Sequence, residues 1–351
     1  MLSRTECTAM RGLAIVAIML HNYCHFVAGI VQENEYLFRT ANNERLWQAL
    51  THPDVLLPVH LLSYFGHYGV PLFLFLSGYG LVLKYEAPEN GTAHSVGALT
   101  FLRQHYQKLL RLLVVGFVLF VVVDTLTPGR FHFQWQHVMA QFAMLINFLP
   151  TPNKIIWPGI YWFFGMIMQV YLVYRLLLYR RSSALAIAIV VLCWLPQACC
   201  QPDGEVLNWL RYNFVGAMLP FCAGILLARH GHLVALDRWP RWAWLLVWVG
   251  STALLPLLCL SFQSWLWAPL AVIVAAVGLV RCMPSLLMRL MVFFGTLSAP
   301  IFVAHPAARK LLIGVAFKDG VYDGLLLYII VTLGLSWAVM QVLQHLNRSS
   351  R

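Results

Sequence analysis

The chain has 351 residues, of which 60% are apolar and only 11% are charged. Because soluble globular chains carry roughly 45–50% apolar and about 25% charged residues, this composition excludes a soluble, a disordered or a collagen-like protein. Eight cysteines are too few for a disulfide-dense secreted scaffold. The net charge of +11 does not indicate a nucleic-acid partner, because the basic residues lie between apolar blocks, where membrane topology accounts for them. What remains is a polytopic membrane protein.

The apolar blocks predict an all-α transmembrane bundle. Residues 112–123 and 184–195 each run without a polar side chain, which is longer than the alternating strand of a membrane barrel. We therefore predict a single domain over residues 1–351 with about ten helical spans of roughly 20 residues each. The spans are expected at residues 11–30, 66–84, 109–127, 158–179, 184–201, 211–229, 242–260, 264–281, 290–309 and 324–346.

The distribution of basic residues predicts the orientation. With the N-terminus inside and ten crossings, sixteen of the 24 Lys and Arg residues lie on the cytoplasmic side, so both termini are predicted to be cytoplasmic. Residues 133–149 are apolar but interrupted by polar side chains, and we interpret them as an interfacial or re-entrant segment. An eleventh span there would move Arg180 and Arg181 outside and weaken the bias.

The first predicted span carries the strongest functional signal. Arg11, His21, Asn22 and His25 share one half of a helix, with Arg11 about 15 Å from His21 along its axis. Polar groups inside a span usually mark a functional site. Imidazole, with an ordinary pKa near 6.5, suits general-base catalysis. The alternative is that both histidines only hydrogen-bond to neighbouring helices.

Further motifs follow in chain order. They are Gly66-His-Tyr-Gly69-Val-Pro71 leading to Ser77-Gly78-Tyr79, Lys108-x-x-Arg111 preceded by Phe101 and Arg103, Pro158-Gly-Ile-Tyr161-Trp162-Phe163, Leu219-Pro-Phe221-x-x-Gly224, and Ser298-x-x-Ile301-Phe302-x-x-His305-Pro306. Together with Arg11-Gly-Leu-Ala and its histidine, they resemble membrane acyltransferase family 3 over almost the whole chain.

The resemblance implies a ten-span bundle in the bacterial inner membrane. Such a protein transfers an acyl group, with acetyl as the default, from cytoplasmic acyl-CoA to a hydroxyl of an envelope glycan or lipid-linked saccharide. The family's general base lies eleven positions after the arginine, where this chain has Asn22, and His21 comes one residue earlier. We expect His21 to be the base, with His25 as the alternative.

Roles follow for the other motif residues. The phosphates of the donor are expected to contact Arg11, Arg103, Lys108 and Arg111, because guanidinium and ammonium groups bind phosphate; membrane topology alone is the alternative explanation for these residues. Substrate contacts are expected from Asn22, Ser77, Tyr79, Tyr161, Trp162 and His305. Ser77 has a second interpretation, as an acylated nucleophile, and the aromatic residues have one as membrane-interface anchors. No zinc motif is present, so no metal is expected.

The outer segment 31–65, which contains Glu33 and Glu35, is where acceptor contacts are expected. Two other classes of function remain open at this point. A transporter or flippase for a lipid-linked sugar or small anion uses polar groups in a bundle equally well. A sensor or scaffold subunit without activity tolerates loss of both first-span histidines. The sequence does not indicate an oligomeric state.

Overall fold

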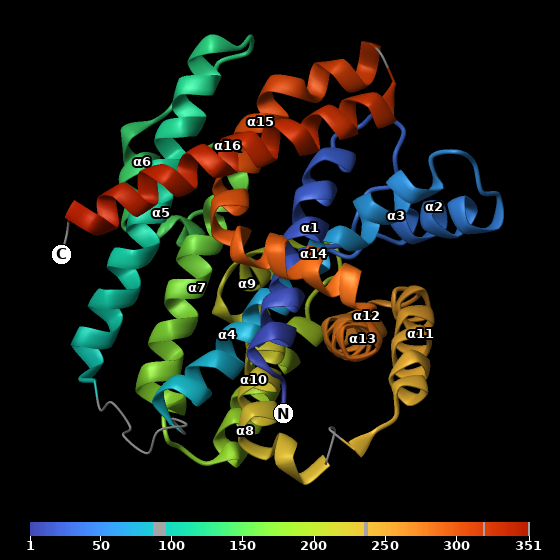
Figure 1. Cartoon of the computed structure of the whole chain (residues 1–351), viewed down its shortest axis with the longest axis vertical. Coiled ribbons are helices and arrows are strands. Elements are labelled where there is room, and N and C mark those ends of the chain that lie inside the picture. The colour runs from blue at the N-terminus through green and yellow to red at the C-terminus, as the bar shows by residue number, and fades with distance from the viewer. Residues whose placement is uncertain (87–95, 235–237, 319, 350–351) are drawn as a thin grey trace.

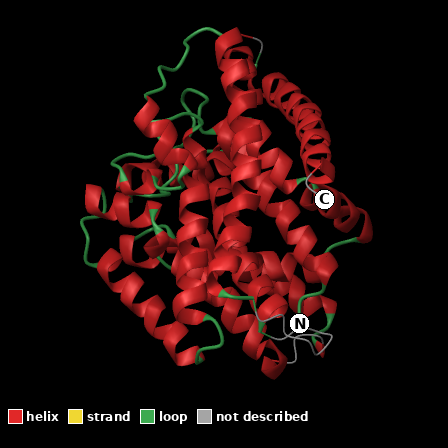
Figure 2. Ribbon diagram, turned by 90° about the vertical axis from the view of Figure 1, so that its left-hand side faces the viewer, coloured by secondary structure: helices red, strands yellow, loops and turns green. Residues whose placement is uncertain are grey.

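The computed structural model describes residues 1–86, 96–234, 238–318 and 320–349. This part of the chain contains helices and loops and no strand (Figure 2), so the all-α prediction is confirmed. The helices are α1 (Arg4–Cys24), α2 (Thr40–Thr51), α3 (Leu57–Phe65), α4 (Gly69–Tyr85), α5 (Ala98–Leu126), α6 (Trp135–Phe142), α7 (Trp162–Val173), α8 (Ser183–Ala198), α9 (Glu205–Tyr212), α10 (Phe214–His230), α11 (Arg241–Leu258), α12 (Phe262–Trp265), α13 (Ala268–Cys282), α14 (Ser285–Thr296), α15 (Ser298–Lys318) and α16 (Val321–Ser349).

Several of these helices are long and apolar enough to cross a bilayer, so the chain is an integral, multi-pass membrane protein. Six helical segments in the described part meet this requirement, and the bent pair α14–α15 makes a seventh if it counts as one span. Each of the ten predicted spans overlaps a helix. Fewer than ten qualify because α8 and α13 are shorter than a full span and because Arg11, His21 and Asn22 lower the hydropathy of α1.

Two segments correct or refine the sequence-based predictions. The predicted ninth span, 290–309, is two helices that meet at a 75° bend instead of one straight helix. Pro300 lies in the first turn of α15, where its missing N–H group cannot bond to the end of α14, so the helix restarts there. Residues 133–149 hold only the eight-residue α6 and the turn Ile146–Phe148, which are too short to cross a membrane.

Helix α1 runs through the middle of the bundle (Figure 1). It begins with a capping box, in which Ser3 accepts from the backbone of Glu6 and the Glu6 carboxylate accepts from the backbone of Ser3. A Cβ built at Gly12 would lie 1.9 Å from the carbonyl oxygen of Met291, and one at Gly295 would lie 1.9 Å from that of Thr8. The backbones of α1 and α14 are therefore in direct contact, which only small residues permit.

Helix α4 is held in the same way between α1 and α10. A Cβ at Gly69 would lie 2.3 Å from the carbonyl oxygen of Ala14, and one at Gly78 would lie 2.2 Å from that of Phe221. The buried apolar residues form two large clusters, one centred on α4, α7, α10 and α13 and the other on α1, α5, α7 and α15. The glycine contacts thus fix the packing of α1 and α4 within the core.

We predict that Gly78→Ala destabilises the protein by about 1–3 kcal/mol, because the new methyl group must push α4 away from α10. Thermal unfolding of the purified protein in detergent measures the effect. The matched control is Gly80→Ala on the same helix, where a Cβ meets nothing within 4 Å. Equal loss of stability in the two variants would show that close packing is not the cause.

Candidate active site

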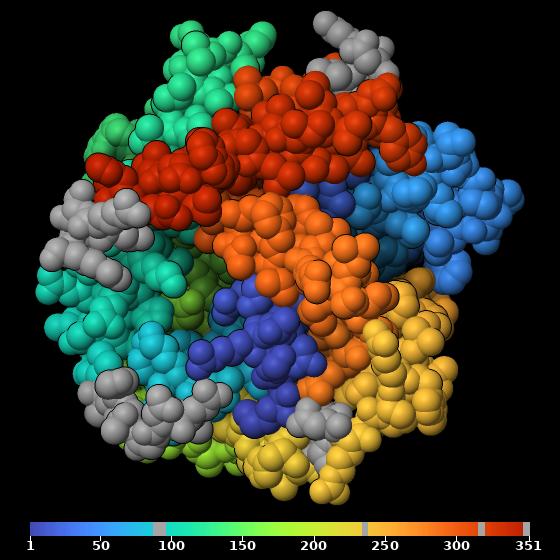
Figure 3. Space-filling model, viewed as in Figure 1, coloured from blue at the N-terminus to red at the C-terminus, as the bar shows by residue number. Residues whose placement is uncertain are grey.

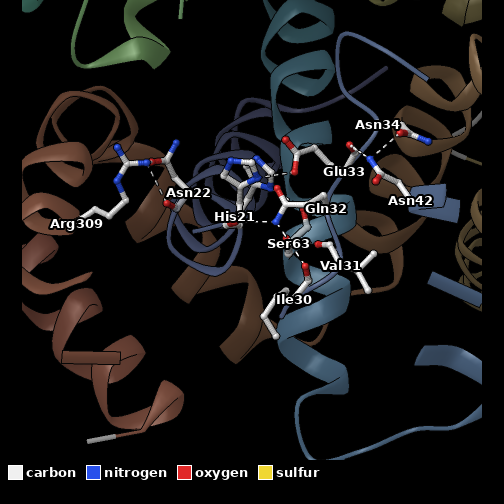
Figure 4. Close-up of polar contacts among 11 residues, drawn as sticks. His21, Asn22, Ile30, Val31, Gln32, Glu33, Asn34, Asn42, Ser63 and Arg309 are labelled. Carbon is white, nitrogen blue, oxygen red and sulfur yellow. Dashed lines mark hydrogen bonds and ion pairs between the residues drawn. The ribbon is translucent and has the colours of Figure 1, made fainter. Parts of the chain in front are cut away.

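A cavity of about 320 Å³ lies where the loop after α1 returns across the end of that helix. It contains four of the predicted catalytic and substrate-binding residues, namely His21, Asn22, His25 and Trp162, and we call it the histidine cavity. Figure 4 shows its polar residues converging from α1, from the loop after it and from α15. The remaining lining residues are Ile18, Phe26, Glu33, Glu35, Tyr36, His67, Val70, Asn153, Lys154, Trp157, Gly159, Ile160, Phe163, Tyr212, Phe302 and Arg309.

His25 and Glu33 form a close pair. The distance from His25 Nδ1 to Glu33 Oε2 is 2.6 Å, and both side chains are largely buried. Burial raises the pKa of Glu33, but the hydrogen bond from His25 and the nearby charges of His21 and His25 outweigh it and hold that pKa at about 2. A carboxylate accepts hydrogen bonds only, so His25 donates from Nδ1 and its Nε2 is left as the proton-accepting nitrogen.

His21 is fixed by a backbone carbonyl. Its Nδ1 lies 2.7 Å from the carbonyl oxygen of Ser63, which has no proton to give, so Nδ1 donates and Nε2 carries the lone pair. The His21 ring lies 5.4 Å from that of His25 and 5.7 Å from that of His67. The loop is tied down on both sides, because Gln32 donates to the His25 carbonyl and Ser63 donates to the Val31 carbonyl. Both first-span histidines are therefore held with Nε2 as the basic nitrogen.

The sequence analysis did not predict Glu33 and Arg309 as individual site residues. Glu33 was noted only as part of the outer segment, and Arg309 entered only the count of Lys and Arg residues, as one of those that the predicted orientation leaves outside. Arg309 is 5% exposed and donates from Nη1 to Asn22 Oδ1 at 2.7 Å. The one available signal for Arg309 was its charge at the end of an apolar segment, four residues after His305.

A second cavity, of about 540 Å³, lies between α5, α7, α15 and α16. Figure 3 shows the surface hollowed between α5 and the α14–α16 segment. Its polar lining includes His105, Lys108 and Arg111, and we call it the basic cavity. Phe163 and Phe302 line both cavities, with ring centroids 5.4 Å apart. The basic cavity and the histidine cavity therefore meet at this pair of rings.

The remaining predicted site residues lie outside the lining of these two cavities. The Tyr79 hydroxyl donates to the Leu2 carbonyl, that of Tyr161 donates to the Val303 carbonyl, and His305 Nδ1 bonds to the Ile301 carbonyl. Ser77 is a neighbour of Tyr171, and Arg11 and Arg103 are exposed. The hydroxyls of Tyr79 and Tyr161 thus bond to the backbone of distant segments, whereas the ring of His305 bonds within its own helix.

The cluster of His21, His25 and Glu33 also has the spacing of a metal site, since one ligand atom of each lies within 4.8 Å of the others. Each Nδ1 is already engaged, by the Ser63 carbonyl in one ring and by Glu33 in the other. The two Nε2 atoms remain free of these bonds, and a histidine held by a carboxylate at Nδ1 and basic at Nε2 can take and return protons.

A family model described as an acyltransferase domain matches residues 6–341. The chain belongs to acyltransferase family 3. It is therefore a membrane-bound acyltransferase, and its family implies an acyl donor. No curated protein and no solved structure matches the chain.

We predict that the contribution of Glu35 to the stability of this acyltransferase falls as the pH rises from about 4.5 to about 8, so that Glu35→Gln gains stability relative to the wild type over this range. Burial and the nearby Glu33 charge raise the pKa of Glu35 from 4.5 to about 8, so the folded state holds a proton that the unfolded state releases. Thermal unfolding between pH 5 and pH 9 measures the effect. Glu44→Gln on the exposed side of α2 is the control, and the idea fails if both variants follow the wild-type curve.

Proposed function

We propose that this acyltransferase moves an acyl group, acetyl by default, from acyl-CoA to a hydroxyl of a cell-envelope carbohydrate in the bacterial inner membrane. The observation that supports this most strongly is the meeting of two chemically different cavities at Phe163 and Phe302. One is basic and apolar, as a nucleotide thioester needs. The other holds a proton-accepting histidine cluster, as an attacking hydroxyl needs.

The basic cavity is the proposed donor site. Lys108 and Arg111 at its lining suit the phosphates of coenzyme A, and the apolar side chains of Leu109, Leu112 and Phe164 suit the uncharged arm that carries the thioester. The predicted orientation, with the start of α5 on the cytoplasmic side, places Lys108 and Arg111 where acyl-CoA is available. Arg11 lies close enough to Lys108 to act on it electrostatically and adds to the positive field.

The histidine cavity is the proposed acceptor site. His25 Nε2 takes the proton from the acceptor hydroxyl while the hydroxyl oxygen attacks the thioester carbonyl. A carbon–oxygen bond forms, the carbon–sulfur bond breaks, and the proton passes from His25 to the departing thiolate of coenzyme A. Direct transfer of this kind needs no acylated residue. The Glu33 carboxylate stabilises the imidazolium that exists between the two proton transfers.

The contact with Glu33 changes the preference between the two histidines. The sequence favoured His21, but the Nδ1 of His21 bonds to an uncharged carbonyl, whereas the Nδ1 of His25 bonds to a carboxylate. A carboxylate stabilises the protonated ring more than a carbonyl does, because the interaction is charge-assisted. We therefore assign proton transfer to His25, with His21 as the alternative that mutation distinguishes.

We predict that His25→Asn lowers kcat by about 10²- to 10⁴-fold. Asparagine keeps an N–H donor near the position of Nδ1 for Glu33 but removes the basic Nε2. The matched variant His21→Asn keeps a donor for the Ser63 carbonyl, and we expect it to retain more activity. The measurement is thiol release from acetyl-CoA by the purified protein in nanodiscs, with a crude envelope-glycan extract as acceptor.

The double variant His25→Asn/Glu33→Gln provides the control. If Glu33 acts through His25, the double variant is no slower than His25→Asn alone, because residues that act as a unit are not additive. Full loss in His21→Asn with activity retained in His25→Asn would move the base to His21. No thiol release by folded wild-type protein, with any extract or acyl-CoA, would contradict the proposed transfer and favour the transporter.

We predict that Lys108→Gln raises KM for acetyl-CoA about tenfold and leaves kcat nearly unchanged, because a charge-assisted phosphate contact is lost in both the bound and the reacting state. The control is Arg103→Gln, since Arg103 is exposed on the same helix but does not line the basic cavity. The donor-site assignment is wrong if Arg103→Gln raises KM as much as Lys108→Gln does.

A further inference from the structure

Arg309 is a buried cation at the wall of the histidine cavity. Its guanidinium carbon lies 3.8 Å from the centre of the Phe26 ring and 5.1 Å from that of Trp157. Asn22 accepts from Nη1 through its side-chain oxygen at 2.7 Å and more weakly through its carbonyl at 3.4 Å (Figure 4). The guanidinium plane is thus stacked on an aromatic ring and anchored at one nitrogen.

No carboxylate pairs with Arg309 in the part of the chain that the structure describes. Three other basic side chains of low exposure do have acidic partners there. These pairs are Arg229 with Glu86, Arg281 with Glu6 and Lys310 with Asp124. A buried cation is strongly disfavoured unless a negative group compensates it, so Arg309, which is more deeply buried than these three, calls for an anionic partner from outside the chain.

The free side of the guanidinium faces the cavity. Among the described residues, the hydrogen bonds of Arg309 come from Nη1. The other two nitrogens are not among the fully buried polar atoms that lack a partner, so they are open to the space beside them. Lys154 lines the same cavity and adds a second positive charge. The Phe26 ring covers one face of the guanidinium, so a ligand binds at the edge of the group, where its N–H groups point. These N–H groups form the fork that suits a planar carboxylate or a phosphate.

We propose that Arg309, assisted by Lys154, binds an anionic oxygen group, a carboxylate or a phosphate, on the acceptor. The acceptor is then an acidic sugar or a saccharide that carries a phosphate. Assigning the anion to the acceptor rests on the proposed function, whereas the anion site itself does not.

The layout of charges supports the acceptor over the donor as the source of the anion. The donor phosphates have their own basic residues in the other cavity, beyond Phe163 and Phe302. Within the histidine cavity, the Glu33 carboxylate repels an anion from its part of the wall, so Arg309 and Lys154 are where the anion binds. Anchoring the anion there holds the acceptor beside the histidine cluster.

The test is a calorimetric titration of the full-length protein in nanodiscs with glucuronate, glucose 1-phosphate and glucose. We expect at least one of the two anions to bind about tenfold or more tightly than glucose, as loss of a charged hydrogen bond implies. Tight binding of glucuronate alone identifies a carboxylate acceptor, and tight binding of glucose 1-phosphate alone identifies a phosphate. Arg309→Gln removes the preference, whereas Arg309→Lys keeps part of it and guards against a misfolded glutamine variant.

Arg130→Gln is the charge control, because Arg130 is exposed and lies outside the lining of the histidine cavity. An anion affinity no higher than that of glucose, including no binding at all, overturns the proposal, and so does a preference that survives Arg309→Gln. Thiol release measured in parallel separates the two claims. Anion-selective binding without thiol release supports the anion site and contradicts the proposed acyl transfer. Thiol release with a neutral glycan acceptor, at a rate that Arg309→Gln leaves unchanged, supports the transfer and contradicts the anion site.

Discussion

The direct backbone contacts of α1 with α14 and α4 are the constraint on which the rest of the site depends. A Cβ at Gly66 would lie 2.6 Å from the Cβ of His21, so the absence of a side chain at Gly66 is what leaves room for the histidine. Gly12 and Gly69 fix the same helix further down. Because apolar side chains give no preference for helix contact over lipid contact, such close packing is what sets the position of α1 in a membrane.

The polar cluster at the end of α1 is stable only as a set. His21 and Asn22 are 7% and 6% exposed, and each depends on a partner from a distant element, the Ser63 carbonyl on α3 or Arg309 on α15. Buried polar groups cost free energy unless they are hydrogen bonded, so a shift of one helix would leave several groups unpaired at once. The charges are also divided within the cluster, with Glu33 beside His25 and Arg309 beside Asn22.

The sequence could predict what depends on local periodicity. The helical repeat placed His21, Asn22 and His25 on one side of a helix, and all three line one cavity. It could not predict the pairing of His25 with Glu33, which depends on the path of the loop after Cys24, or that of Asn22 with Arg309, which are 287 residues apart. Pro300 is a sequence signal for the bend at Leu297, but apolar residues continue on both sides of the bend and were therefore predicted as a single span. The motif glycines indicated a close approach of helices or ligands, while the backbones that they bring together are visible only in three dimensions.

The boundary at Phe163 and Phe302 explains why the proposed donor and acceptor residues lie on different helices. The phosphates of a donor need a basic, water-accessible site. The general base needs a site that excludes water, so that the acceptor hydroxyl is the group that attacks the thioester. Two aromatic rings lie between the cavities, so in the proposed transfer only the acyl carbon has to reach the boundary. Helix α7 supplies Phe163 and α15 supplies Phe302, and α15 also carries Arg309 in the histidine cavity. One helix therefore contributes both to the wall between the cavities and to the proposed acceptor site, so in the proposed mechanism the position of α15 couples the place where the acyl group arrives to the place where its acceptor is held.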